Sequence, residues 1–62
     1  MNRVVEILMR RDNLSREEAL NQIQTVRQMM ENCGYNPEEC EDIMMDELGL
    51  EMDYIDDVLF GD

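Results

Sequence analysis

The sequence of 62 residues contains no His, no Lys and no Trp, and it has only one Pro, one Phe and three Gly. His and Lys are among the side chains that most often move protons or form covalent intermediates in enzymes, so their absence removes most catalytic designs. The one serine, Ser15, stands where a helix cap is expected, and Thr25 falls in the middle of an expected helix. Carboxylates are abundant, but their pattern is typical of solvated faces. We therefore predict a protein that is not an enzyme and has no cofactor.

The sequence also lacks metal-binding motifs. Cys33 and Cys40 are separated by six residues, whereas a zinc knuckle needs about two to four, and no His completes a site. A calcium-binding EF-hand loop requires Gly at its sixth position, but loops that begin at Asp42 or Asp46 have Glu there. We predict no metal site and two buried, reduced thiols, with a disulfide across the corner between the second and third helices as the alternative.

Long hydrophobic runs are missing too. The longest apolar runs are three residues each, at positions 7–9, 43–45 and 58–60, so no segment can span a membrane. The N-terminal region becomes charged at Glu6 and Arg10, which is unlike a secretory signal peptide. These patterns predict a cytoplasmic protein with no membrane partner.

Charge divides the sequence into two halves. Residues 1–30 carry all five Arg and four acids, a net charge of +1. Residues 31–62 carry twelve acids and no base, a net charge of −12, which gives −11 for the whole chain. Such asymmetry between the halves of a chain indicates an interaction surface of one sign.

Hydrophobic residues make up 44% of the sequence, which argues against a disordered chain. A chain this short forms one domain with a small core, so residues 1–62 are expected to be a single helical domain. The first helix is expected over residues 2–11 and ends at Asp12 and Asn13. With a single Phe and no Trp, the core must be aliphatic, and Met is suited to filling its irregular gaps.

The second helix has the clearest start. Ser15 and Glu18 fit a capping box, in which the side chain of each residue bonds to the backbone amide of the other. The apolar positions that follow recur every three or four residues, as on one face of a helix: Ala19, Ile23, Val26, Met30 and Cys33. Gly34 is expected to end this helix in the left-handed conformation.

The third helix is expected to begin with Asn36 as its cap and Pro37 at its first position, and to end at Gly49. Leu50 is then expected to fold back under the core. A short fourth helix follows over residues 52–59. Together these patterns predict an all-α fold: a small three-helix bundle with a short fourth C-terminal helix.

The second and third helices, joined by the turn CGYNPE, invite comparison with a helix-turn-helix, but their charges oppose DNA binding. The helix that would enter the major groove carries six acids and no base: Glu38, Glu39, Glu41, Asp42, Asp46 and Glu47. Contacts to DNA phosphates require cations there. We predict no direct binding to nucleic acid.

The acids recur in two ridges at helical spacing. The ridge on the third helix is Glu38, Asp42 and Asp46, and the ridge on the fourth is Asp53, Asp56 and Asp57. Like charges at these spacings destabilise a helix by about 0.2–0.5 kcal/mol per pair. Two interpretations stay open: a solvated face that keeps a small protein soluble, or a face matched to a cationic partner. Solubility alone does not require that residues 31–62 contain no base.

Two pairs of adjacent methionines bear on self-association. Neighbouring residues on a helix point about 100° apart, so both members of a pair cannot face one core. One member of each pair is expected at a boundary, where it would favour a homodimer. The candidate residues are Met29, Met30, Met44 and Met45. A monomer with methionines at the edge of its core is the alternative.

The tail ELGLEMDYIDDVLF resembles the ending of small acidic helical proteins of bacteria, phages and prophages. In that group a capped helix similar to SREEALNQI precedes an acidic helix and an LGLE-x-DYI-type close. The resemblance covers residues 14–60 and rests on structural features: the cap, Gly49, Leu50, Tyr54 and Ile55. It implies a fold and a bacterial or phage origin, but no site.

Two hypotheses about function follow. The first is a non-enzymatic acidic interaction module, an inhibitor or nucleic-acid mimic of phage or prophage type, which binds a basic protein surface such as that of a nucleic-acid enzyme. Acidic phage proteins of this size often antagonise such enzymes, which supports the mimic by analogy. The alternative is a small homo-oligomeric structural or assembly protein.

Overall fold

The computed structural model describes residues 2–61, and every regular element among them is helical. In chain order the elements are α1 (Arg3–Arg11), α2 (Arg16–Asn32), α3 (Pro37–Ile43), the π-helical turn η1 (Met44–Leu48), the 3₁₀ turn η2 (Met52–Tyr54) and α4 (Ile55–Phe60). The all-α class predicted from the sequence is therefore confirmed.

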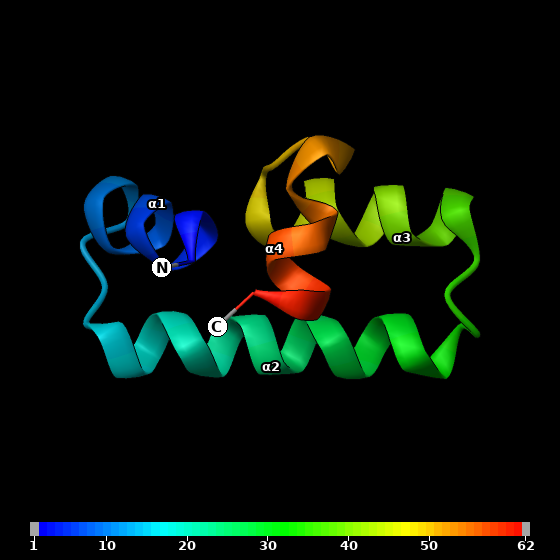
Figure 1. Cartoon of the computed structure of the whole chain (residues 1–62), viewed down its shortest axis with the longest axis horizontal. Coiled ribbons are helices and arrows are strands. Elements are labelled where there is room, and N and C mark those ends of the chain that lie inside the picture. The colour runs from blue at the N-terminus through cyan, green and yellow to red at the C-terminus, as the bar shows by residue number, and fades with distance from the viewer. Residues whose placement is uncertain (1, 62) are drawn as a thin grey trace.

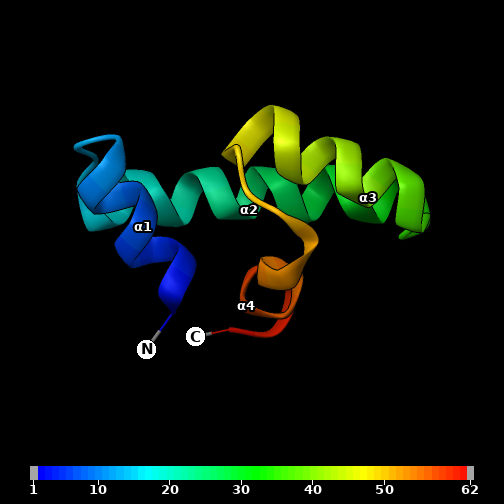
Figure 2. The ribbon, with the colours of Figure 1, turned by 90° about the horizontal axis from the view of Figure 1, so that it is seen from above.

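The longest helix, α2, forms one side of the molecule, and the other three helices contact it. In Figure 1, α1 lies over the N-terminal part of α2 and α3 lies over its C-terminal part. The short helix α4 contacts both α1 and α2. Its axis runs across the direction of α2 in Figure 1, and it is seen nearly end-on in Figure 2. This arrangement does not confirm a three-helix bundle, because α1 and α3 occupy opposite ends of α2.

The core is small and aliphatic, with one contribution from α4. Its buried side chains are Val4, Val5 and Leu8 from α1, Ala19, Ile23, Val26 and Met30 from α2, Cys40, Met44, Leu48 and Leu50 from the third helical segment and the residues after it, and Val58 from α4. The stripe predicted on the second helix is confirmed except at Cys33, which is half-buried. Leu50 folds back into the core as expected, with 8% of its surface exposed.

Local hydrogen bonds explain where α2 starts. The Glu18 amide donates to the Ser15 hydroxyl at 3.1 Å, and the Ser15 amide donates to the Glu18 carboxylate at 3.0 Å. The capping box is thereby confirmed. The amide and hydroxyl of Ser15 hold the pKa of Glu18 below its usual range. The box therefore stabilises the fold above the ordinary Glu pKa, and this contribution is lost as pH falls through the lowered value.

A Schellman motif ends α2. The Tyr35 amide donates to the Met30 carbonyl at 2.9 Å, and the Gly34 amide donates to the Glu31 carbonyl at 3.0 Å. Gly34 has the left-handed conformation that this motif requires, with φ of 65°. The stop predicted at this glycine is confirmed.

The third helix differs from the prediction in its last turn. The sequence favours a regular helix up to Gly49, but the α-helix ends at Ile43 and a π-helical turn follows. The wider turn forms because the Gly49 amide donates to the carbonyls of both Met44 and Met45, with Gly49 at a φ of 66°. Met44 and Leu48, which bracket this turn, are both buried in the core, so packing into the core accompanies the change in local geometry.

The fourth helical segment is present where it was predicted, although its first turn is a 3₁₀ turn and it extends to Phe60. Six residues are too few for an α-helix that is stable by itself, so α4 depends on its contacts with the rest of the chain. Within residues 2–61, no helix combines the length and the apolar character needed to cross a bilayer.

Candidate functional site

We define the acidic surface as the five members of the two predicted ridges that are exposed in the structure: Glu38, Asp42, Asp46, Asp53 and Asp56. Glu38 and Asp42 lie on α3, and Asp46 lies on η1. None of the five forms an ion pair with another residue of the described chain. Their carboxylates are therefore free to meet a partner.

The two ridges do not continue one another. The third helical segment lies along α2, whereas α4 runs across it (Figure 1). Glu38, Asp42 and Asp46 therefore follow a different direction from Asp53 and Asp56. The last acid of the first ridge also lies in the π turn rather than in a regular helix. A partner would meet two short rows of carboxylates instead of one straight row.

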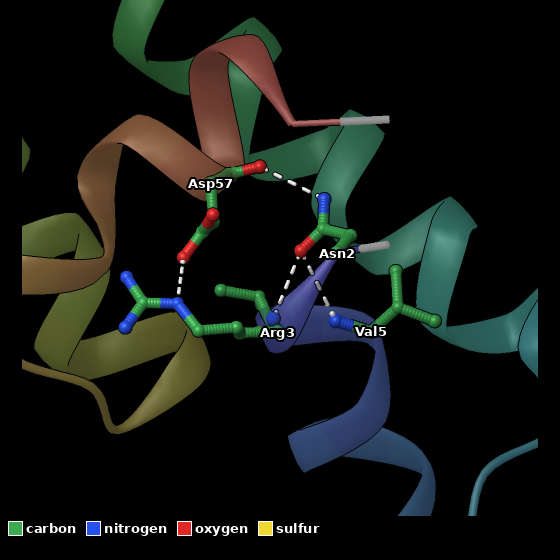
Figure 3. A network of polar contacts seen from close by, with 5 residues as sticks. Asn2, Arg3, Val5 and Asp57 are labelled. Carbon is green, nitrogen blue, oxygen red and sulfur yellow. Dashed lines mark hydrogen bonds and ion pairs between the residues drawn. The ribbon is translucent and has the colours of Figure 1, made fainter.

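The sixth predicted member, Asp57, has a structural role in the fold. Its carboxylate accepts a hydrogen bond from the Nε of Arg3 at 2.7 Å, and its carbonyl accepts one from the side chain of Asn2 at 2.8 Å (Figure 3). Asn2 is buried, and its side-chain oxygen accepts from the amides of Val4 and Val5, which caps α1. Asp57 thus joins the start of α1 to α4, and it is not part of the free acidic surface.

Arginines of the N-terminal half donate hydrogen bonds to backbone carbonyls of the C-terminal half. Arg27, on α2, donates from its Nε to the carbonyl of Val58 and from its Nη2 to the carbonyl of Gly61 at 3.1 Å, which satisfies the end of α4. Arg11 donates from its Nη2 to the Leu48 carbonyl at 2.6 Å, at the end of η1. Both cations stand where the helix dipole is negative.

These arginine contacts were missed by sequence reasoning. One signal was available: neither α3, η1 nor α4 has a basic residue in its last turn, so their terminal carbonyls need donors from elsewhere. The partners themselves could not be chosen from the sequence, because Arg11 and Leu48 are 37 residues apart and Arg27 and Val58 are 31 apart.

The electrostatic result is an uneven division of charge. Among residues 2–61 the ion pairs are Arg3 with Asp57 and Arg11 with Asp12. Arg11 holds the pKa of Asp12 below its ordinary value by a hydrogen bond between the two side chains. Three of the five arginines donate hydrogen bonds to other residues of the fold. The acids of residues 38–56, by contrast, are exposed and form no ion pair with the described residues.

The methionine pairs separate as the helical geometry requires. Met30 and Met44 are completely buried in the core of the chain, so they are not available to a second copy. Met29 and Met45 are exposed, at 36% and 54% of their surfaces. The predicted self-association is therefore confined to Met29 and Met45, and it stays a prediction.

Both cysteines are free thiols at the corner between α2 and α3. Cys33 is half-buried and donates a hydrogen bond from its Sγ to the Met30 carbonyl at 3.1 Å. Cys40 is 2% exposed, and burial, followed by the charge and hydrogen bond of Cys33, raises the pKa of its thiol above the usual range. A buried thiol with a raised pKa is a poor nucleophile.

We expect iodoacetamide at pH 8 to alkylate Cys33 first and Cys40 only after unfolding, because Cys33 is half-buried whereas Cys40 is 2% exposed and burial raises the pKa of its thiol. Peptide mass spectrometry at successive times, with and without urea, measures both rates. Equal rates in the native protein would contradict the burial of Cys40.

Raising the pH through the elevated pKa of Cys40 should also lower the thermal midpoint of unfolding, since the folded state favours the protonated thiol there.

Within residues 2–61, no three His, Cys, Asp or Glu side chains converge closely enough to hold a metal ion. Every buried side-chain nitrogen or oxygen in this part of the chain has a hydrogen-bond partner. Comparison of the chain with protein-family models, with curated proteins and with solved structures finds no match in any of the three.

Proposed function

We propose that this protein acts by binding, and that its acidic surface docks on a basic surface of a partner protein. The observation that carries the proposal is the division of charge within the fold. Three arginines are engaged in internal contacts, while Glu38, Asp42, Asp46, Asp53 and Asp56 stay exposed and without cations. Exposed carboxylates without ion pairs attract a cationic surface by long-range electrostatics and thereby raise its association rate.

The arrangement of the acids has an energetic cost that a partner would relieve. Glu38, Asp42 and Asp46 stand four residues apart, a spacing at which like charges destabilise a helix by about 0.2–0.5 kcal/mol per pair. Asp46 also lies near the C-terminal end of its helical segment, where the dipole disfavours an anion. Cations on a partner would replace these repulsions with attractions, so binding would gain energy from both effects.

The basic partner that we favour is a nucleic-acid enzyme, because its binding groove has basic side chains that contact the phosphates of nucleic acid. Two rows of unpaired carboxylates would compete with the phosphate backbone for those cationic side chains. On this proposal the protein is an inhibitor that mimics nucleic acid, and it needs no catalytic group.

Neutralising two acids tests the proposal directly. We expect the Asp42→Asn, Asp46→Asn variant to lose binding and to gain a few tenths of a kcal/mol in stability, since the repulsive pairs 38/42 and 42/46 both disappear. The control is Glu17→Gln, Glu31→Gln, which neutralises two exposed acids of α2 and reaches the same net charge of −11 + 2 = −9.

The measurement is a pull-down from a bacterial lysate with the three proteins as bait, washed at low and high salt and with duplex DNA as competitor. The proposal predicts a basic protein that salt and DNA both release, that the control retains and that the Asp42, Asp46 variant does not. Retention that is equal for all three baits, or that salt does not reduce, would reject it.

A further inference from the structure

A groove of about 410 Å³ lies between α1 and the η2 turn, and none of the five acids of the acidic surface lines it. Its lining residues are Arg3, Glu6, Ile7, Arg10, Arg11 and Tyr54. The first five recur at spacings of three, one, three and one, so they form a single face of α1. The groove thus gathers three of the five arginines of a protein whose net charge is −11.

The fold leaves many hydrogen-bond donors of these arginines unused. Arg3 gives only its Nε to Asp57, so both of its Nη atoms are without a partner among residues 2–61. Arg11 uses Nε and Nη2 for Asp12 and the Leu48 carbonyl, which leaves Nη1. Arg10 is exposed and makes no hydrogen bond or ion pair with the described residues, so its whole guanidinium is available.

The walls of the groove are partly fixed before any ligand arrives. The guanidinium of Arg3 lies over the ring of Tyr54, 5.1 Å from the ring centroid, and is also tied to Asp57. Tyr54 and Ile7 are half-buried and give the groove an apolar wall. Two of the three guanidinium groups are held by the fold, which reduces the conformational entropy that a ligand would have to remove.

We propose that this groove binds a small soluble phosphate compound, with Arg3, Arg10 and Arg11 as the phosphate-binding residues. A single carboxylate would offer little that Asp57 and Asp12 do not already provide to two of these arginines. A phosphate group has more negative charge and more acceptor oxygens, and guanidinium groups bind it in a bidentate manner. Arg3 and Arg10 are seven residues apart, about 10 Å along the helix, so the groove suits a diphosphate or a phosphate with an organic body.

The net charge of the protein decides between sources of phosphate. An extended polyanion, such as nucleic acid or an anionic membrane, would bring many phosphates close to the acidic surface and be repelled. A small ligand carries few charges, and at about 0.15 M salt the Debye length of about 8 Å screens most of the distant carboxylates. The groove is therefore assigned to a free phosphate compound.

Inorganic pyrophosphate is the probe, titrated into the whole protein at constant ionic strength, with sodium chloride as the matched blank. Binding is followed by NMR through the Nε signals of the arginines and the ring signals of the two tyrosines. We expect saturable shifts at Arg3, Arg10, Arg11 and Tyr54, and none at Tyr35, which lies outside the groove. Circular dichroism verifies that each variant is folded.

Three variants separate a phosphate site from a general ion effect. Arg10→Gln removes the guanidinium that has no structural contact, and should weaken binding about tenfold or more without changing the fold. Arg16→Gln, which removes an arginine outside the groove, should leave the affinity unchanged. Glu6→Gln removes the one acid in the lining and should tighten binding.

Several results would overturn the assignment. Shifts that grow linearly without saturation, that sodium chloride reproduces, or that Arg10→Gln and Arg16→Gln alter equally would show an adventitious ion only. Shifts of the groove residues that depend on protein concentration without pyrophosphate would show that a second copy occupies the groove instead.

Discussion

Replacing Met44 with Glu is expected to unfold this protein, whereas replacing Met45 with Glu is expected to leave it folded. Met44 is fully buried and Met45 is 54% exposed, although they are adjacent in the sequence. A carboxylate at position 44 would lie in an aliphatic core with no cation among its buried neighbours, and the lost methionine contacts add to the desolvation cost. We expect a loss of more than about 4 kcal/mol, which is comparable with the total stability of so small a domain.

Urea titration followed by circular dichroism measures the effect, with the Met45→Glu variant as the matched control. A Met44→Glu variant with the midpoint of the natural protein would contradict the burial of Met44 in the core. The same pair of variants examines self-association. If the natural protein is a dimer through its exposed methionines, sedimentation should show that Met45→Glu is a monomer. A natural protein that is monomeric at all concentrations would reject the homodimer.

The Arg27→Gln variant is expected to lose about 2–3 kcal/mol of stability and to release α4 from the rest of the fold. The side chain of Arg27 is half-buried, and it bonds to the carbonyls of Val58 and Gly61 from the neighbouring helix α2. Hydrogen bonds from a charged donor are worth about 1.5–3 kcal/mol, and the cation also opposes the negative end of the helix dipole. Without it the carbonyls of Val58 and Gly61 would have no hydrogen-bond partner among residues 2–61.

Amide hydrogen exchange identifies where this stability is lost. In Arg27→Gln the amides of α4 should exchange much faster than those of α2, whereas Arg16→Gln should change neither, because Arg16 is exposed and makes no hydrogen bond from its side chain to residues 2–61. In Arg27→Lys the amides of α4 should exchange at a rate between those of the natural protein and of Arg27→Gln. Lysine keeps the positive charge, but it has a single nitrogen to donate to two carbonyls. Uniform acceleration of exchange along the chain would instead indicate global unfolding and no specific role at α4.

Local patterns in the sequence were enough to predict most helix boundaries. The capping box of Ser15 and Glu18, the cap at Asn36 with its proline, and the left-handed Gly34 and Gly49 depend on residues within a few positions of one another. Hydrogen bonds of this kind form in the same way whatever the rest of the chain does. The same reasoning predicted that one methionine of each adjacent pair would lie at a boundary, and the apolar stripe of the second helix already included Met30.

The candidate site was predicted only in part, because local patterns do not show which residues distant in the sequence come into contact. Exposure of Glu38, Asp42 and Asp46 follows from helical spacing, since the opposite side of their helix is apolar. Asp57 has the same local pattern but meets Arg3, which is 54 positions away. No periodicity within α4 distinguishes it from Asp56, so its removal from the acidic surface required the position of α1.

By itself, the sequence determined the helical class, the ends of α2, the start of α3 and the concentration of negative charge in the second half of the chain. The tertiary structure alone decided how α4 packs against α1 and α2, where the π turn forms and which arginines meet which carbonyls. Helix caps and periodicity arise from contacts between near neighbours, which the order of residues fixes. The arginine contacts and the groove of α1 join residues far apart in the chain, and their formation depends on how the helices pack around one small core.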